Sequence, residues 1–173
     1  QRCRPGTRGD DDHGREILSA QLNAGDELRD AAVEFLRELR DERAVPYLIE
    51  ELKVSTDWHG TFLAQELGAI GTEEAVKALI ESLDREEHLI RRGAVRGLDD
   101  ARDPVAIEPL VQRLDDPDGK VRKLASEALE RFGAPALAAV QRAYDRADPH
   151  AGRLRSVLRS TLESLKESVW RDT

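Results

Sequence analysis

The chain has 173 residues, of which 39% are hydrophobic and 36% are charged, and it carries a formal net charge of −8. This acidic balance disfavours non-specific binding to nucleic acid, and no apolar run is long enough to span a membrane, so we expect no membrane partner. A single cysteine, Cys3, excludes an intrachain disulfide and favours a cytoplasmic location.

Residues 1–14, QRCRPGTRGDDDHG, contain charged residues and glycines but no periodic apolar residues. This composition predicts a disordered or expression-derived tail. The run at 10–13 brings three carboxylates and an imidazole together in the sequence. A flexible tail does not hold such ligands in a fixed geometry, so we expect no metal site here.

A repeat begins after this tail. One segment recurs with a spacing of 31 residues and without gaps, at 28–39, 59–70, 90–101 and 121–132. A fifth copy at 154–165 starts 33 residues after the fourth. The same column of this alignment holds Leu36, Leu67, Leu98 and Leu129. Four copies without gaps predict a repeat architecture.

A second segment lies between these copies and repeats with the same period, at 44–52, 75–83 and 106–114. A looser copy occupies 135–144, and a truncated copy occupies 15–22. Apolar residues at i, i+3, i+4 and i+7, as in V-x-x-L-I-x-x-L, form the stripe of an amphipathic helix. No segment alternates with a period of two, so we predict no strands.

Turn residues separate the two kinds of segment. Gly71 and Gly133 follow the last apolar residue of a predicted helix, where a left-handed C-cap favours glycine. Candidate N-caps are Asp57, Thr72, Asp103, Asp118 and Asp148. The sequence therefore predicts an all-α protein of about five helical hairpins and a C-terminal tail at 170–173. The predicted hairpins are 15–40, 44–70, 73–101, 104–132 and 135–169.

Three motifs resemble those of a known family: the VRxxAxxALxxxG pattern at 121–133, the AVxxLIxxL pattern, and the D-P-D turn at 116–118. They resemble HEAT-like repeats, and more narrowly the short subtype named after phycobilisome bilin lyases, over roughly residues 15–165. The resemblance implies a right-handed α-α superhelix with AVxxLIxxL helices on the convex side and VRxxAxxAL helices lining the concave side. The subtype occurs in bilin lyase subunits and in many prokaryotic scaffold proteins, so it specifies architecture rather than function.

The resemblance also sorts the concave helices into buried and displayed positions. It implies a partner-binding surface at Asp30, Glu34, Trp58, Phe62, Gln65, His88, Arg92, Arg96, Lys120, Lys123 and Arg153. This surface is acidic in repeat one, aromatic at Trp58 and Phe62, and basic in the later repeats. Aromatic anchors supply affinity and charges fix orientation. Two alternatives stay open: the aromatic pair repacks into the core, and the charged positions form a solvated face without a partner.

An arginine recurs at one position of the concave helices, as Arg29, Arg91, Arg122 and Arg155. The resemblance implies that these arginines bridge to turn carboxylates of adjacent repeats, in preference to forming an anion-binding ladder. The candidate carboxylates are Asp41, Asp103, Asp115 and Asp116. Trp170 follows the last apolar stripe, and we expect it to cap the exposed edge of the final hairpin.

We expect a non-enzymatic scaffold that binds a protein or peptide in the concave groove, with no catalytic residue, cofactor or metal. The sequence contains no nucleophile elbow, Gly-rich phosphate loop or C-x-x-C motif. One alternative is nucleic-acid binding through the basic repeats three to five. Another is a bilin-lyase-like subunit in which Trp58, Phe62, Arg92 and Arg96 hold a tetrapyrrole.

Overall fold

The computed structural model describes residues 42–171, and within this range every regular element is an α-helix or a 3-10 helix (η). In chain order these elements are η1 (Glu42–Ala44), α3 (Val45–Val54), α4 (Trp58–Ile70), α5 (Glu73–Ser82), α6 (His88–Ala101), η2 (Pro104–Ala106), α7 (Ile107–Gln112), η3 (Arg113–Asp115), α8 (Gly119–Phe132), α9 (Ala134–Arg146) and α10 (Gly152–Arg171). The expected tail at 1–14 and hairpin at 15–40, with Asp30 and Glu34, lie outside the described residues.

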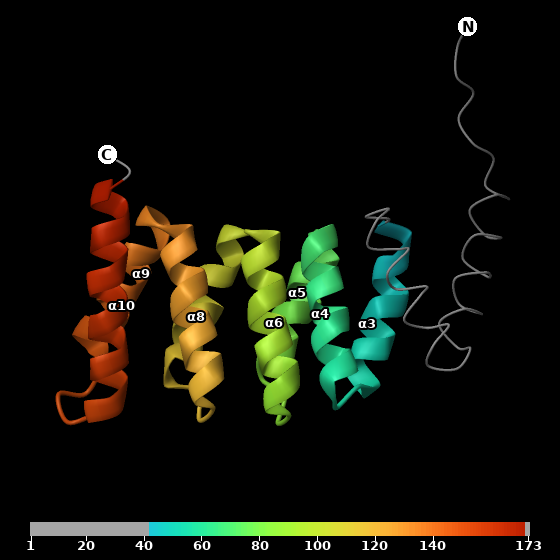
Figure 1. Cartoon of the computed structure of the whole chain (residues 1–173), viewed down its shortest axis with the longest axis horizontal. Helices are drawn as coiled ribbons and strands as arrows, with labels where there is room; N and C mark the ends of the chain where they lie inside the picture. Colours follow the sequence, from blue (N-terminus) through green and yellow to red (C-terminus); the bar gives the residue numbers. More distant parts are fainter. Residues whose placement is uncertain (1–41, 172–173) are drawn as a thin grey trace, which may run out of the picture.

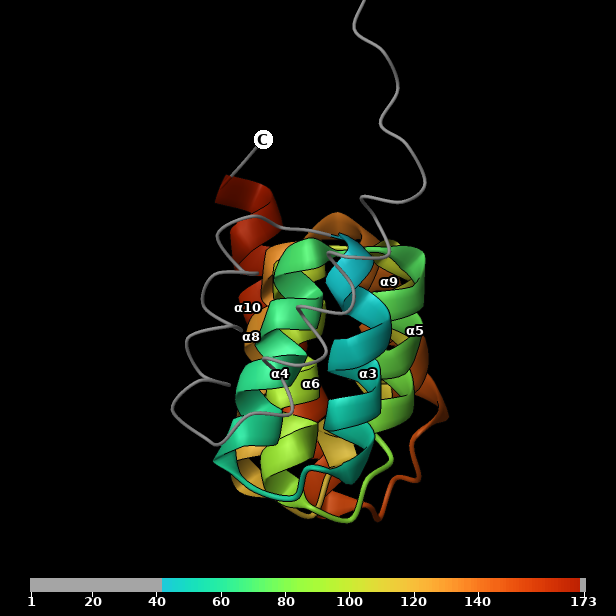
Figure 2. The same cartoon turned by 90° about the vertical axis from the view of Figure 1, so that its right-hand side faces the viewer.

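The helices are arranged in two layers. In Figure 1, α4, α6, α8 and α10 stand side by side along the long axis of the molecule. The end-on view of Figure 2 shows these helices on one side and α3, α5 and α9 on the other. We call α4, α6, α8 and α10 the B-helix layer, and α3, α5, α7 and α9 the A-helix layer. Each hairpin is an A helix followed by a B helix, so the predicted all-α solenoid is confirmed.

Polar side chains and a glycine fix where the B helices begin and end. Asp57 accepts a hydrogen bond from the backbone N–H of His59 at the start of α4, and Asp118 accepts two from the first turn of α8. Gly71, directly after α4, has a φ of 70°, the left-handed conformation that favours glycine. Asp148 was expected to cap a helix, but its hydrogen bond lies within the turn before α10 begins.

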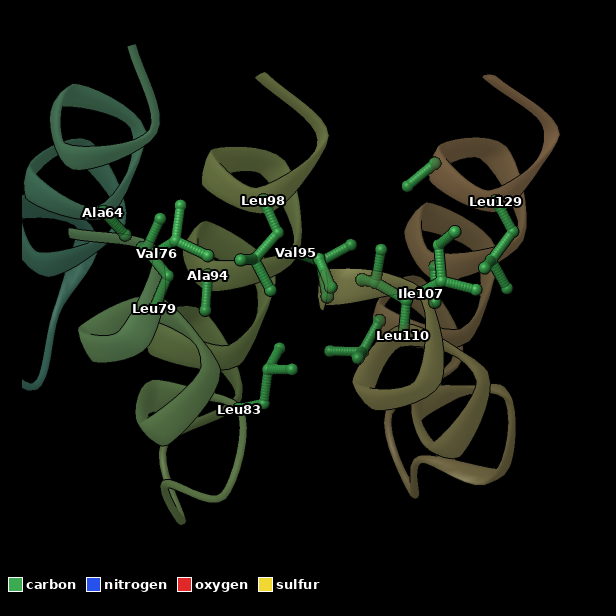
Figure 3. Close-up of a cluster of buried hydrophobic side chains, with 14 of the residues drawn as sticks. Ala64, Val76, Leu79, Leu83, Ala94, Val95, Leu98, Ile107, Leu110 and Leu129 are labelled. Carbon is green, nitrogen blue, oxygen red and sulfur yellow. The ribbon is translucent and has the colours of Figure 1, made fainter. Parts of the chain in front are cut away.

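A continuous apolar core lies between the layers. Two leucine columns, one from each layer, are at most 1% exposed: Leu67, Leu98 and Leu129, and Leu48, Leu79 and Leu110. Figure 3 shows Leu79, Leu98, Leu110 and Leu129 among the side chains that fill the space between hairpins. Burying one leucine side chain contributes about 1.5–3 kcal/mol relative to leaving it exposed. The repeat period therefore places equivalent side chains in the core of successive hairpins.

Helices α4 and α6 touch backbone to backbone. A Cβ atom added to Gly68 would lie 2.2 Å from the carbonyl oxygen of Gly97, and one added to Gly97 would lie 2.3 Å from that of Ala64. A Cβ on Gly93 would lie 2.7 Å from the Cα of Thr61. Side chains do not fit at such distances, so this α4–α6 seam requires glycine. The glycines inside α6 stand four residues apart, a spacing that lets two helices approach closely.

The C-terminal edge is closed by α10. Leu158, Leu162 and Leu165 face the core, whereas the exposed side of the helix carries charged residues, among them Arg159 and Lys166. A polar outer face of this kind keeps the last repeat of a solenoid soluble. The expected capping role of the tryptophan at position 170 was wrong, because its side chain is 79% exposed. Helix α10 also continues to Arg171, past the expected hairpin end at 169.

Candidate functional site

Trp58 is displayed on the surface. It is the first residue of α4, directly after the capping Asp57, and its side chain is 63% exposed. Its indole meets the imidazole of His59 edge to face, with ring centroids 6.0 Å apart. Phe62, one turn later, is half-buried and packs against the core. The structure therefore separates the predicted aromatic pair into one exposed ring and one core-facing ring.

Arg92 has an internal partner. Its Nε and Nη2 donate to the two carboxylate oxygens of Asp118 at 3.0 and 2.7 Å, a bidentate ion pair between consecutive B helices. The guanidinium holds the pKa of the Asp118 carboxyl well below its usual range. Because the same carboxylate caps α8, the pair fixes one hairpin on the next. The first role of Arg92 is therefore to stabilise the packing of consecutive hairpins, and any role in a binding surface is additional.

Two further predicted cations are also paired. Arg153 lies 2.8 Å from Asp115, and Lys123 lies 3.5 Å from Glu127, with all four side chains largely exposed. Arg96 and Lys120 form no ion pair with any residue of the described range, and both are exposed, as is His88. Carboxylates therefore stand beside three of the cations that the sequence placed at the basic C-terminal end, two of them brought there by stacking and one from the same helix.

One hollow of about 220 Å³ lies between α6 and α8. Two predicted residues line this α6–α8 hollow, Gln65 and Arg96, together with Leu124 and several charged side chains. Among those, Asp99 is buried and accepts a hydrogen bond from Arg131 across the hollow. Partial burial raises the pKa of the neighbouring Asp100 carboxyl, and nearby arginines oppose that shift. The hollow thus contains both signs of charge.

A second hollow, of about 450 Å³, lies between α8 and α10. Of the predicted site residues, only Lys123 lines this α8–α10 hollow. The remaining wall includes Arg122, Ser126, Glu130 and Val157, and Glu127 lines both hollows. The sequence pattern did not identify Ser126 and Glu130 as site residues, although they lie one helical turn after Lys123 and Glu127, respectively.

The recurring arginines bind at the turns inside the hairpins. Arg91 makes a buried bidentate ion pair with Asp116, at 2.9 Å for both contacts, and donates to two turn carbonyls. Arg122 and Arg155 instead donate to backbone carbonyls, and Arg155 also lies 4.4 Å from the ring centroid of Tyr144. The expected carboxylate bridge is confirmed for Arg91 and wrong for the other two. Arg29 lies outside the described residues.

Two arginines that the pattern did not single out connect consecutive hairpins. Arg85 donates to the carbonyls of Leu52, Lys53 and Ser55 at the end of α3, at 3.3, 2.9 and 3.0 Å. Arg113 donates to the carbonyl of Leu83 at 2.7 Å. The last carbonyls of a helix lack intrahelical partners, and the guanidinium fork satisfies them. These contacts tie the hairpins of α5 and α7 each to the preceding hairpin.

Within residues 42–171, no three or more His, Cys, Asp or Glu side chains come together as a metal ligand set. The run at 10–13 lies outside that range. A search of the same residues for a helix long and apolar enough to cross a membrane found none.

No curated protein matches this chain. Among solved structures, the complex of CpcE and CpcF of phycocyanin lyase from Nostoc sp. PCC7120 is similar, with 23% identity and a TM-score of 0.61 over 96% of this chain and 68% of that chain. An engineered protein has 21% identity and a TM-score of 0.50 over 91% of this chain and 49% of its own. The model of the family described as HEAT repeats matches residues 15–99, 61–130 and 84–163. This chain therefore belongs to the HEAT repeat family.

Proposed function

We propose that this chain is a non-enzymatic scaffold that binds a protein or peptide along the B-helix layer. The observation that carries this proposal is the exposed Trp58 side chain on the same layer as the two hollows. A tryptophan covered by a partner supplies a large apolar contact with little rotamer entropy to lose. The hollows beside α8 offer polar groups that can orient a chain laid across them.

The distribution of charge favours a polypeptide over nucleic acid. Arg92 is held by Asp118, and carboxylates stand beside the exposed cations Lys123 and Arg153, so a nucleic acid would meet negative charge at each of these positions. Phosphate backbones bind surfaces on which Lys and Arg are available to replace counterions. Of the five cations that suggested nucleic-acid binding, Arg96 and Lys120 alone lack an ion pair with the described residues. This distribution of charge therefore disfavours the nucleic-acid alternative.

A bilin-lyase-like role is the second candidate. The similarity to the complex of CpcE and CpcF extends over 96% of this chain, and that complex contains two different subunits. A tetrapyrrole would need cations for its propionates. Of the cations on the α6–α8 hollow, Arg131 is bonded to Asp99, whereas Arg96 forms no ion pair in the described range and interacts with Asp100 at longer range. Addition of a bilin to the purified chain tests this role, because binding would change the visible absorption spectrum.

Peptides selected by display on the full chain provide the test of the scaffold proposal. We expect Trp58→Ala to weaken the binding of the selected peptides about tenfold or more, because an aromatic anchor is lost. The matched control is Trp170→Ala, which removes the other exposed indole. Equal affinity for wild type and Trp58→Ala, with unchanged helicity by circular dichroism, would contradict the proposed binding face.

A cytoplasmic location stays a prediction.

A further inference from the structure

The α8–α10 hollow changes charge along its length. Arg122 and Lys123 line the part nearest the start of α8, whereas Glu127 and Glu130 line the part further along the same helix. At a rise of 1.5 Å per residue, Lys123 and Glu130 stand about 10 Å apart along the helix axis. One helix therefore gives the hollow a basic end and an acidic end.

The charged groups at both ends of the α8–α10 hollow are still able to bind a ligand. Arg122 donates to two backbone carbonyls of the preceding turn and makes no ion pair with a carboxylate of the described chain. Glu130 accepts a long hydrogen bond, 3.4 Å, from Ser126. The ion pair of Lys123 with Glu127 is exposed, at 66% and 42%, so little free energy is lost when a ligand replaces it.

We propose that the α8–α10 hollow receives a mixed-charge segment of a polypeptide partner. Acidic residues of the segment lie against Arg122 and Lys123, basic residues lie against Glu130, and Val157 adds an apolar contact. This inference rests on the proposed function and names the class of partner. A nucleic acid would place phosphates against Glu130, and a uniformly basic segment would meet Arg122, so both are disfavoured by like charge.

Four labelled probes test this assignment by fluorescence polarisation with the full chain. They are a mixed-charge peptide with acidic residues at one end and basic residues at the other, a uniformly acidic peptide, a uniformly basic peptide and a single-stranded oligonucleotide. We expect the mixed-charge peptide to bind about fivefold more tightly than either uniform peptide, the effect of about one exposed ion pair. Tighter binding of the oligonucleotide than of the mixed-charge peptide overturns the proposal.

Charge reversal at either end should change which probe is preferred. Lys123→Glu leaves the hollow acidic, so we expect about fivefold weaker binding of the mixed-charge peptide and tighter binding of the basic peptide. Glu130→Lys leaves it basic and should favour the acidic peptide. The matched control is Lys77→Glu, the same charge change at an exposed position of α5 in the other layer.

The outcomes separate this inference from the proposed function. If the mixed-charge peptide binds and both reversals leave its affinity unchanged, the hollow is not its site, although the scaffold proposal stands. If no probe binds wild type, the mixed-charge assignment is wrong, and the display selection with Trp58→Ala decides the scaffold proposal independently.

Discussion

Gly68 and Gly97 meet so closely that a Cβ on Gly68 would lie 2.2 Å from the carbonyl oxygen of Gly97. A Cβ on Gly97 itself would lie 2.3 Å from the carbonyl oxygen of Ala64. Overpacking of this kind forces backbones apart, so we expect Gly97→Ala to lower the free energy of unfolding by about 1–3 kcal/mol. Urea denaturation followed by circular dichroism measures the change. The control is Gly152→Ala, where a Cβ meets nothing within 4 Å. A Gly97→Ala variant as stable as that control would show that the seam is looser than described.

The adjacent residues Asp115 and Asp116 form a natural comparison between an exposed and a buried ion pair. The carboxylate of Asp116 is fully buried against Arg91, whereas that of Asp115 is 50% exposed against Arg153. We expect Asp116→Ala to lower the free energy of unfolding by about 3–5 kcal/mol, because it leaves a buried guanidinium without its partner. Asp115→Ala should lower it by less than about 1 kcal/mol. Similar losses in the two variants, measured by urea denaturation, would contradict this difference.

The ion pair of Arg92 with Asp118 predicts a dependence of stability on pH. The folded state lowers the pKa of Asp118 below its ordinary value of 3.8, so its stabilisation is complete above that pH. As the pH falls below 3.8, the unfolded state takes up the proton before the folded state does, so this stabilisation is lost progressively until the folded state is protonated as well. We expect Asp118→Asn to unfold at a lower urea concentration than wild type at neutral pH. The difference between their unfolding midpoints should become smaller in acid. A difference independent of pH would show that the charge on Asp118 is not responsible.

The two tryptophans of the chain provide a direct check on exposure. In a Trp170→Phe variant, Trp58 is the sole indole, and its 63% exposure predicts emission close to that of the urea-unfolded chain. Unfolding should therefore change this fluorescence little while circular dichroism reports the loss of helix. An emission maximum at much shorter wavelength in the folded variant would place the indole in the core.

The helices and their core positions could be predicted because each repeat must bury the same stripe. Leu67 and Leu98 occupy one column of the sequence alignment and are fully buried. The partner of Arg92 could not be predicted in this way, because Asp118 lies 26 residues further along the chain and meets it only after stacking. Spacing along a helix gives the face of a residue, whereas the neutralisation of its charge depends on the neighbouring hairpin. The hollows beside α8 depend on that packing as well.

The guanidinium groups of Arg85 and Arg113 reach backward to carbonyls of the preceding hairpin, over 30 residues or more of sequence. Such links add to the nearest-neighbour coupling of a one-dimensional array, where cooperativity depends on interfaces more than on individual units. Fraying of one terminal hairpin then exposes carbonyls or arginines of the next. The linked hairpins should therefore melt as a block, and the geometry between Trp58 and the hollows beside α8 should persist until that block is lost.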